Sequence, residues 1–272
     1  MKNAIQRCLT GIIYVAVIVS GILINSYSFL ILFAGVTFFC LHEFYGLLNK
    51  QKNAGINLGY NSFGGVLLFV STYLFSAGLT SHFIFFVYLL YLIVSLIGEL
   101  YAKKNDPIQH MAYLFLGQVY IALPISLLNF VAFSETVYLP VMILALFVFI
   151  WINDTGAYCI GVLFGKHRLF KRVSPKKSWE GFFGGLIFTI ASSFIFFHLY
   201  SDTPCYHWIG LAIGVVILGT FGDLIESLMK RTLGVKDSGN TIPGHGGFLD
   251  RFDSFLLAIY AVLAYSCLII QN

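Results

Sequence analysis

Charged residues are scarce in this sequence. Asp, Glu, Lys and Arg make up 10% of the 272 residues, whereas soluble domains carry roughly a quarter. Hydrophobic residues make up 58% and stand in long runs rather than in short alternating segments. The low charge excludes an ordinary soluble domain, and the lack of alternation argues against a membrane β-barrel.

Paired cysteines are also missing, and a removable leader is not expected. The five cysteines are scattered and form no Cys-x-x-Cys motif, so the sequence predicts neither a zinc site nor a disulfide framework. Lys2 and Arg7 precede an apolar run, but no small-residue cleavage site follows that run. We therefore interpret this segment as a first transmembrane helix and not as a cleaved signal peptide.

Long apolar runs are what the sequence has in abundance. Crossing a bilayer takes about 20 residues in a helix, and a helix satisfies its own backbone hydrogen bonds in lipid. The sequence therefore predicts an all-α fold, a polytopic transmembrane helix bundle with about nine spans. The predicted spans are 8–25, 28–48, 61–79, 82–101, 111–133, 137–157, 181–200, 206–229 and 252–270.

The predicted spans fall into two groups along the chain. Residues 1–136 form an N-terminal transmembrane bundle of the first five spans. Residues 137–272 form a C-terminal, catalytic transmembrane bundle of the last four. The second bundle carries two loops longer than the others, near 158–180 and 230–251.

The basic residues predict an orientation. With the N-terminus in the cytoplasm, all 16 Lys and Arg fall in loops on the cytoplasmic side, where short loops are usually basic. We therefore expect a multi-pass protein of the cell inner (plasma) membrane. The loop 158–180 is denser in charge than orientation requires, which suits phosphate binding. Its basic residues are Lys166, Arg168, Lys171, Arg172, Lys176 and Lys177. Nucleic acid is not an expected partner, because no soluble domain is present to hold it.

Carboxylates within the predicted spans lie toward the cytoplasmic ends. Acids in a bilayer are costly, and many mark functional sites. Interhelical ion pairs are the alternative, and that alternative stays open for Glu43, Glu99 and Glu226. The acids within or next to the spans are Glu43, Glu99, Asp154, Asp223, Glu226 and Asp250.

One helix face combines acid, hydroxyl and cation. Glu226, Ser227 and Lys230 follow Asp223 at three, four and seven residues, so helical periodicity places all four on one face. Gly222 beside them permits a second backbone to approach closely. The sequence therefore predicts a polar helix face directed toward the cytoplasmic end.

The loop before the last span is rich in glycine. Gly244, Gly246 and Gly247 permit positive φ angles, and N–H groups exposed there can hold an anion. Asp250 and Asp253 stand at the start of the following helix, and helix capping remains an alternative role, chiefly for Asp253. Asp223 and Asp250 near basic residues predict a site for Mg²⁺ and phosphate, since Mg²⁺ prefers one or two carboxylates together with substrate phosphates.

Two stretches of the chain resemble a known family. The first reads Ser227-Leu-Met-Lys230-Arg231, then Lys236-Asp237, then Pro243-Gly-His245-Gly-Gly and Asp250-Arg-Phe-Asp253. It is similar to the signature motif of the CDP-diacylglycerol synthases, or phosphatidate cytidylyltransferases. The second stretch comprises Asn153-Asp154 and Ser174 to Gly181, with Ser178 where the family is expected to have threonine. The resemblance covers the C-terminal half, whereas residues 1–140 match only in hydrophobic character and length.

The resemblance implies an enzyme that joins CTP to phosphatidic acid and releases CDP-diacylglycerol and pyrophosphate. It implies a Mg²⁺ cofactor held by Asp223 and Asp250, a homodimer, and an active site facing the cytoplasm. It implies Asp223, Asp250 and Lys230 as catalytic residues. Substrate contacts are expected from Lys176, Lys177, Ser178, Ser227, Arg231, Lys236, His245 and Asp154.

Three other functions stay open. A CTP-dependent polyprenol or dolichol kinase would move the γ-phosphoryl group to an alcohol. The same chemistry could also act on another lipid acceptor, such as an ether phosphatidate. A transporter would also place charges within spans, but an internal repeat and helices broken near the midplane are expected there, and no repeat is evident.

Overall fold

The computed structural model describes residues 2–102, 106–200, 203–239 and 246–270. The chain forms two compact units. The first comprises Met1–Pro140 and Leu233–Arg251, and the second comprises Val141–Thr232 and Phe252–Asn272. The first unit therefore includes most of the predicted loop 230–251, and the division of the chain at residue 136 stays a prediction.

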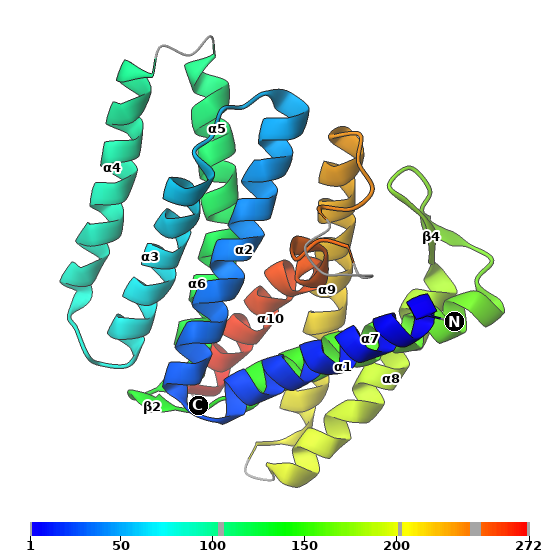
Figure 1. Cartoon of the computed structure of the whole chain (residues 1–272). Coiled ribbons are helices and arrows are strands. Elements are labelled where there is room, and N and C mark those ends of the chain that lie inside the picture. Colours follow the sequence, from blue (N-terminus) through cyan, green and yellow to red (C-terminus); the bar gives the residue numbers. More distant parts are fainter. Residues whose placement is uncertain (1, 103–105, 201–202, 240–245, 271–272) are drawn as a thin grey trace. The chain divides into compact units, whose positions relative to one another are not determined.

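The first unit is a bundle of antiparallel helices (Figure 1). The helices α2 and α6 pack on α3, α4 packs on the side of α3, and α1 contacts α2. A short 3₁₀ turn, η3, follows the glycine-rich loop and contacts α2. The elements are α1 (Lys2–Leu23), α2 (Ser26–Lys52), α3 (Leu58–Ser76), η1 (His82–Ile84), α4 (Phe85–Tyr101), α5 (Pro107–Gly117), η2 (Gln118–Ala122), α6 (Leu123–Ala132), β1 (Phe133–Ser134), β2 (Val137–Tyr138) and η3 (Leu249–Arg251).

Polar groups inside this bundle bind one another. The segment η2 is one turn of π-helix, and it joins α5 to α6 just before Pro124. The Gln118 side chain donates from Nε2 to the Tyr45 hydroxyl at 3.1 Å and to the Asn61 carbonyl oxygen at 2.9 Å. Glu99 and His110 form a second buried pair, with His110 Nδ1 2.7 Å from Glu99 Oε1, so Glu99 has a partner on a neighbouring helix. Such pairing keeps polar atoms satisfied where lipid cannot.

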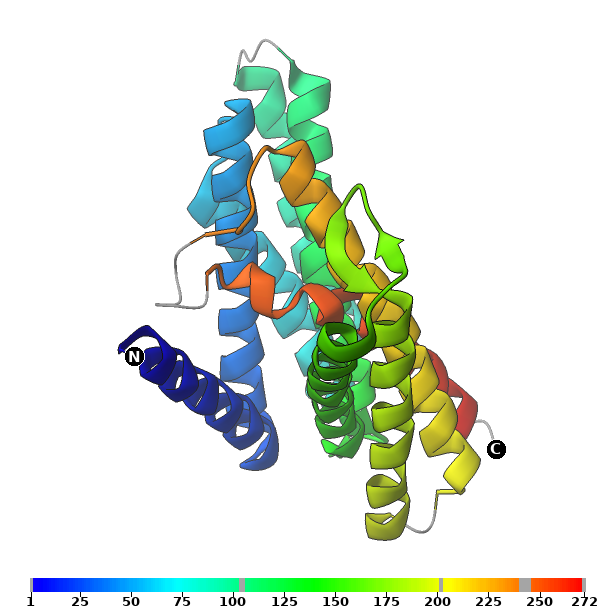
Figure 2. The ribbon, with the colours of Figure 1, turned by 90° about the vertical axis from the view of Figure 1, so that its right-hand side faces the viewer.

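The described residues of the second unit form four long helices and a basic hairpin, and Figure 2 shows them from a second side. The helix α8 packs along α7 and α9, and α10 packs along α9. The hairpin pairs Arg168 with Ser178 and Phe170 with Ser174. The elements are α7 (Val141–Phe164), β3 (Arg168–Phe170), β4 (Ser174–Ser178), α8 (Trp179–Leu199), α9 (Cys205–Thr232) and α10 (Asp253–Ile270).

Glycine determines how closely these helices approach. A Cβ atom at Gly185 of α8 would lie 2.8 Å from the Asn153 carbonyl oxygen of α7, and one at Gly181 would lie 2.9 Å from the Ala157 carbonyl oxygen. At Gly222 of α9, a Cβ atom would lie 2.6 Å from the Asp253 carbonyl oxygen. The prediction that Gly222 admits a second backbone is thus confirmed. Small residues at membrane helix contacts commonly serve this purpose.

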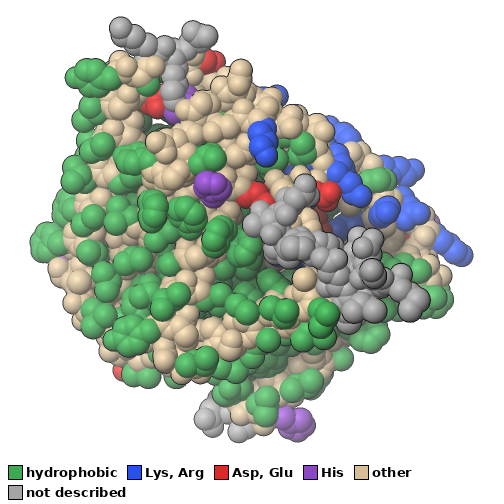
Figure 3. Space-filling view, in the orientation of Figure 1, with side chains coloured by type: hydrophobic (Ala, Val, Ile, Leu, Met, Phe, Trp, Pro, Cys, Tyr) green, Lys and Arg blue, Asp and Glu red, His purple; other side chains and the backbone are tan. Residues whose placement is uncertain are grey.

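The predicted all-α, multi-pass membrane fold is confirmed. Seven helical segments of the described chain are long and apolar enough to cross a membrane, and two shorter apolar helices occupy Leu9–Leu23 and Asp253–Leu268. Hydrophobic side chains cover the face formed by α3 and α4 (Figure 3). The number of nine spans and the cytoplasmic N-terminus stay predictions.

Two loop predictions were wrong in part. The predicted loop 158–180 begins too early, because α7 continues to Phe164 and the remainder holds the β3–β4 hairpin. Val162, Leu163 and Phe164 extend the apolar helix beyond the length that a bilayer requires. Likewise, α9 continues to Thr232, past the predicted loop start at 230.

Candidate functional site

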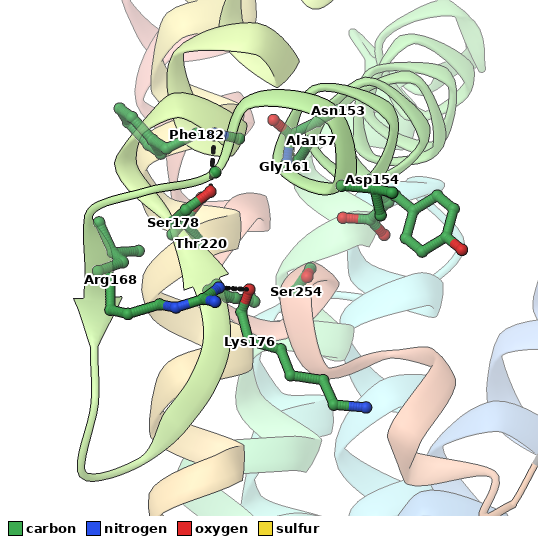
Figure 4. Close-up of a pocket in the computed structure, with 16 residues that line it drawn as sticks. Asn153, Asp154, Ala157, Gly161, Arg168, Lys176, Ser178, Phe182, Thr220 and Ser254 are labelled. Atoms are coloured by element: carbon green, nitrogen blue, oxygen red, sulfur yellow. Dashed lines mark hydrogen bonds between the residues drawn. The ribbon is translucent and has the colours of Figure 1, made fainter.

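A pocket of about 590 Å³ opens in the second unit. Its walls come from α7, the β3–β4 hairpin and the start of α8, and from single residues of α9 and α10 (Figure 4). The walls carry the predicted substrate-binding residues Asp154, Lys176, Lys177 and Ser178. These side chains come from two separate stretches of the sequence, and the fold brings them together in one pocket.

Ser178 lines the pocket at the point where the hairpin strand β4 ends and α8 begins. It is the N-cap of α8, and its Oγ accepts a hydrogen bond from the Gly181 N–H at 3.1 Å. The side chain is buried, at 4% exposure. A cap of this kind needs only a hydroxyl, so the departure from the expected threonine leaves the local structure unchanged.

The basic hairpin is tied to α8 by Glu180. This carboxylate accepts backbone N–H groups of Lys166 and His167 at 3.2 Å, and it pairs with the His167 ring at 2.6 Å. Across the hairpin, Arg168 donates to the Lys176 carbonyl oxygen at 3.3 Å. No role was predicted for Glu180 from the sequence. Its position in the first turn of a helix, directly after a basic loop, was the available signal.

Asp223 on α9 has a cation and a hydroxyl as partners. The Lys177 ammonium forms an ion pair with Asp223 Oδ2, and Ser227 Oγ donates to Asp223 Oδ1 at 3.1 Å. The two charged side chains are 32% and 26% exposed, so both are reachable by solvent. The predicted metal ligand thus lies beside a lysine of the pocket wall.

Further acids of the second unit lie near Asp223. Asp253, at the start of α10, interacts electrostatically with Asp223 and with Asp154. Asp253 Oδ1 also accepts the Ser254 N–H at 2.6 Å. Carboxyl groups from three helices therefore lie next to a pocket whose hairpin wall carries basic side chains.

Lys230 has a carboxylate partner of its own. Its Nζ lies 3.3 Å from Glu226 Oε1, one helical turn earlier, and the two side chains are 13% and 2% exposed. The alternative for Glu226, an ion pair within the membrane protein, is therefore the arrangement observed. Arg231, the next residue, is exposed.

Asp250 belongs to the first unit. Its Oδ2 accepts the N–H groups of Ser238 and Gly247, each at 2.9 Å. Gly246 has φ 86°, so the prediction of a positive φ is confirmed there. Among the glycine N–H groups expected to hold an anion, that of Gly247 thus binds the carboxylate of Asp250, and Gly244 lies outside the described residues. Lys236 is exposed, and His245 lies outside the described residues.

The donor chemistry fits a hard divalent cation. Mg²⁺ takes oxygen ligands and is often held by one or two carboxylates plus phosphate. The Asp223 carboxylate forms an ion pair with the Lys177 ammonium, and the Asp250 carboxylate is held in one orientation by two N–H donors. Among the residues that the structure describes, no cluster of three or more His, Cys, Asp or Glu is arranged to bind a metal without further ligands.

Known proteins are similar to part of this chain. A phosphatidate cytidylyltransferase of Staphylococcus epidermidis is 46% identical over 119 residues, which is 43% of this chain and 45% of that protein. One of Haemophilus influenzae is 46% identical over 123 residues, 43% of each chain. The alignments thus span less than half the length of these relatives. The family model described as the cytidylyltransferase family matches residues 5–269. The chain therefore belongs to the cytidylyltransferase family.

Proposed function

We propose that this protein transfers the cytidylyl group of CTP to phosphatidic acid, giving CDP-diacylglycerol and pyrophosphate for phospholipid synthesis. The observation that carries the proposal is the pocket wall of Arg168, Lys176 and Lys177 beside the acid Asp223. Phosphates need cations to hold them, and a metal that accompanies them needs carboxylates. The names of the aligned relatives support the same reaction.

The reaction requires little proton transfer. A phosphate oxygen of phosphatidic acid, already anionic, attacks the α-phosphorus of CTP. The bond from that phosphorus to the bridging oxygen breaks, and its electron pair leaves with pyrophosphate. Lys176 and Lys177 would hold phosphate oxygens and offset the charge that builds up on the leaving group. Ser178 would keep the hairpin aligned with α8.

Asp223 and Asp250 would hold Mg²⁺. When bound, the ion neutralises phosphate charge and aligns the reacting oxygens. Asp250 is suited to this role because two N–H donors fix its carboxylate. Lys230, Arg231, Lys236 and His245 are proposed as further phosphate contacts, with Ser227 orienting Asp223 and Asp154 contributing from the pocket wall.

The location of the protein in the cell and its orientation in the membrane are part of this proposal. All 16 Lys and Arg fall on one side when nine spans begin in the cytoplasm, which supports an active site that faces the cytoplasm in the plasma membrane. Blue side chains gather around the hairpin in Figure 3. CTP would enter from the cytosol and the lipid from the bilayer. A homodimer is expected from the family resemblance.

Position-specific labelling of CTP tests the proposed reaction. Purified protein is mixed with Mg²⁺, phosphatidic acid and CTP labelled at either the α- or the γ-phosphorus. The proposal expects a lipid product that carries the α label and never the γ label. A γ-labelled lipid would instead identify a lipid kinase, and no labelled lipid with any phosphatidate would refute cytidylyl transfer.

A further inference from the structure

Glu43 on α2 binds both arms of the glycine-rich loop. Its Oε2 accepts the Ser238 hydroxyl at 2.9 Å and the Leu249 N–H at 2.7 Å. These partners are 195 and 206 residues away in the sequence, and all three residues belong to the first unit. One carboxylate therefore fixes the chain both before and after the central part of the loop.

The same loop residues hold Asp250. The Ser238 N–H donates to Asp250 Oδ2 while the Ser238 hydroxyl donates to Glu43. Gly247, two residues before Leu249, supplies the second N–H to Asp250 Oδ2. Ser238 thus bridges two carboxylates, and its 3% exposure shows that the bridge is protected from water.

The space around Glu43 admits no additional side-chain atoms. A Cβ atom at Gly239 would overlap Glu43 Oε1. One at Gly247 would overlap Ser238 Oγ and lie 2.7 Å from Glu43 Oε2. An added Cβ atom at either glycine would therefore force the Glu43 carboxylate or the Ser238 hydroxyl to move, whereas Gly246 is favoured by its positive φ of 86°.

We infer that Glu43 is a positioning residue that orients Asp250 for cation binding, an inference that rests on the proposed function. Hydrogen bonds to an ionised acceptor are stronger than neutral ones and hold a loop more firmly. Groups that orient a metal ligand without touching the metal affect metal affinity. Glu43 is such a group for Asp250. It binds the hydroxyl of Ser238, whose N–H donates to Asp250, and it binds the N–H of Leu249, the residue directly before Asp250.

The test measures cation binding separately from catalysis. Mn²⁺ is titrated by electron paramagnetic resonance into purified protein with CTP and no lipid acceptor, and the Mg²⁺ dependence of the rate is measured in parallel. In Glu43→Ala, both the Mn²⁺ Kd and the Mg²⁺ concentration for half-maximal rate should rise roughly 10-fold or more. Glu43→Gln keeps an acceptor oxygen and should recover most of the loss.

Glu99→Gln is the matched control, because Glu99 is another membrane carboxylate of the first unit, paired with His110 instead of the loop. It should lower the melting temperature without changing the Mn²⁺ Kd. If Glu43→Ala does not fold, Ser238→Ala removes only the hydroxyl link and should show a smaller rise. Unchanged Mn²⁺ binding in the folded variants, or no saturable Mn²⁺ binding by the wild type, overturns the inference. Failure of the proposed function appears separately, as absence of CDP-lipid from the wild type.

Discussion

Lys177 on β4 and Asp223 on α9 form an ion pair beside the pocket of the second unit. The pair joins a predicted phosphate-binding residue to a predicted metal ligand. Both side chains are about one-third exposed or less, at 32% and 26%, so ligands can reach the pair. The ammonium of Lys177 is therefore a cation that lies directly next to Asp223.

Replacing Lys177 with Gln should weaken the binding of CTP. A hydrogen bond to a charged group is worth about 1.5–3 kcal/mol, which corresponds to a rise in KM for CTP of roughly 10-fold or more. Steady-state kinetics at saturating Mg²⁺ measure this change. Lys171→Gln is the control, because Lys171 is an exposed residue of the same hairpin that does not line the pocket. Equal effects of the two substitutions would argue against a specific contact at Lys177.

Asp223→Asn and Asp250→Asn should each lower the rate of CDP-lipid formation by about 100-fold or more, because the amide cannot replace a charged metal ligand. The product is quantified from α-labelled CTP. Circular dichroism in detergent should show an unchanged helix content. Glu135→Gln, at an exposed acid outside the site, should retain the wild-type rate. Wild-type turnover in either Asp variant would refute the metal assignment.

The buried pair of Glu226 and Lys230 allows stability to be separated from catalysis. Glu226→Leu leaves the Lys230 charge without this partner and should destabilise the fold by about 3–5 kcal/mol. Adding Lys230→Met should restore much of that stability, because no buried charge of the pair remains. Thermal unfolding in detergent compares the variants. The double variant should nevertheless lack activity if Lys230 contacts phosphate, whereas full activity would assign Lys230 a purely structural role.

Gly185→Ala should destabilise the contact of α7 and α8. The added Cβ would lie 2.8 Å from the Asn153 carbonyl oxygen, and such overpacking costs about 1–3 kcal/mol. The melting temperature should fall accordingly. Gly46→Ala is the matched helical control, since a Cβ there meets nothing within 4 Å and alanine favours the helix. An unchanged melting temperature for Gly185→Ala would show that the helices can separate without loss.

The helices could be predicted because their cause is local. An apolar run in lipid must satisfy its own backbone, so composition alone indicates α2, α3 and α8. Contacts at helical spacing follow from the same geometry, as with Ser227 and Asp223. The β3–β4 hairpin could not be predicted this way, because Ser174–Ser178 is short, basic and without apolar alternation.

Contacts between residues far apart in the chain could not be predicted from the sequence. The Glu43 carboxylate was identified as a costly membrane acid, but its contacts with Ser238 and Leu249 depend on packing between α2 and a loop about 200 residues later. Asp223 was expected at a metal site because it is an acid near basic residues, and Lys177 was expected to bind phosphate because its loop is dense in positive charge. Their ion pair depends on how β4 packs against α9, and the periodicity of the sequence does not predict that packing.

Ala157, Gly161 and Gly181 form one part of the pocket lining, here called the floor, where α7 and α8 come so close that a Cβ atom at Gly181 would lie 2.9 Å from the Ala157 carbonyl oxygen. Main-chain atoms have no rotamers, so the floor cannot reshape itself around a bulkier guest. Discrimination between ligands must then come from the walls, where Arg168, Lys176 and Phe182 can vary. Changing ligand preference in this protein should therefore be a matter of exchanging wall residues, while the floor sets a size limit that every accepted ligand shares.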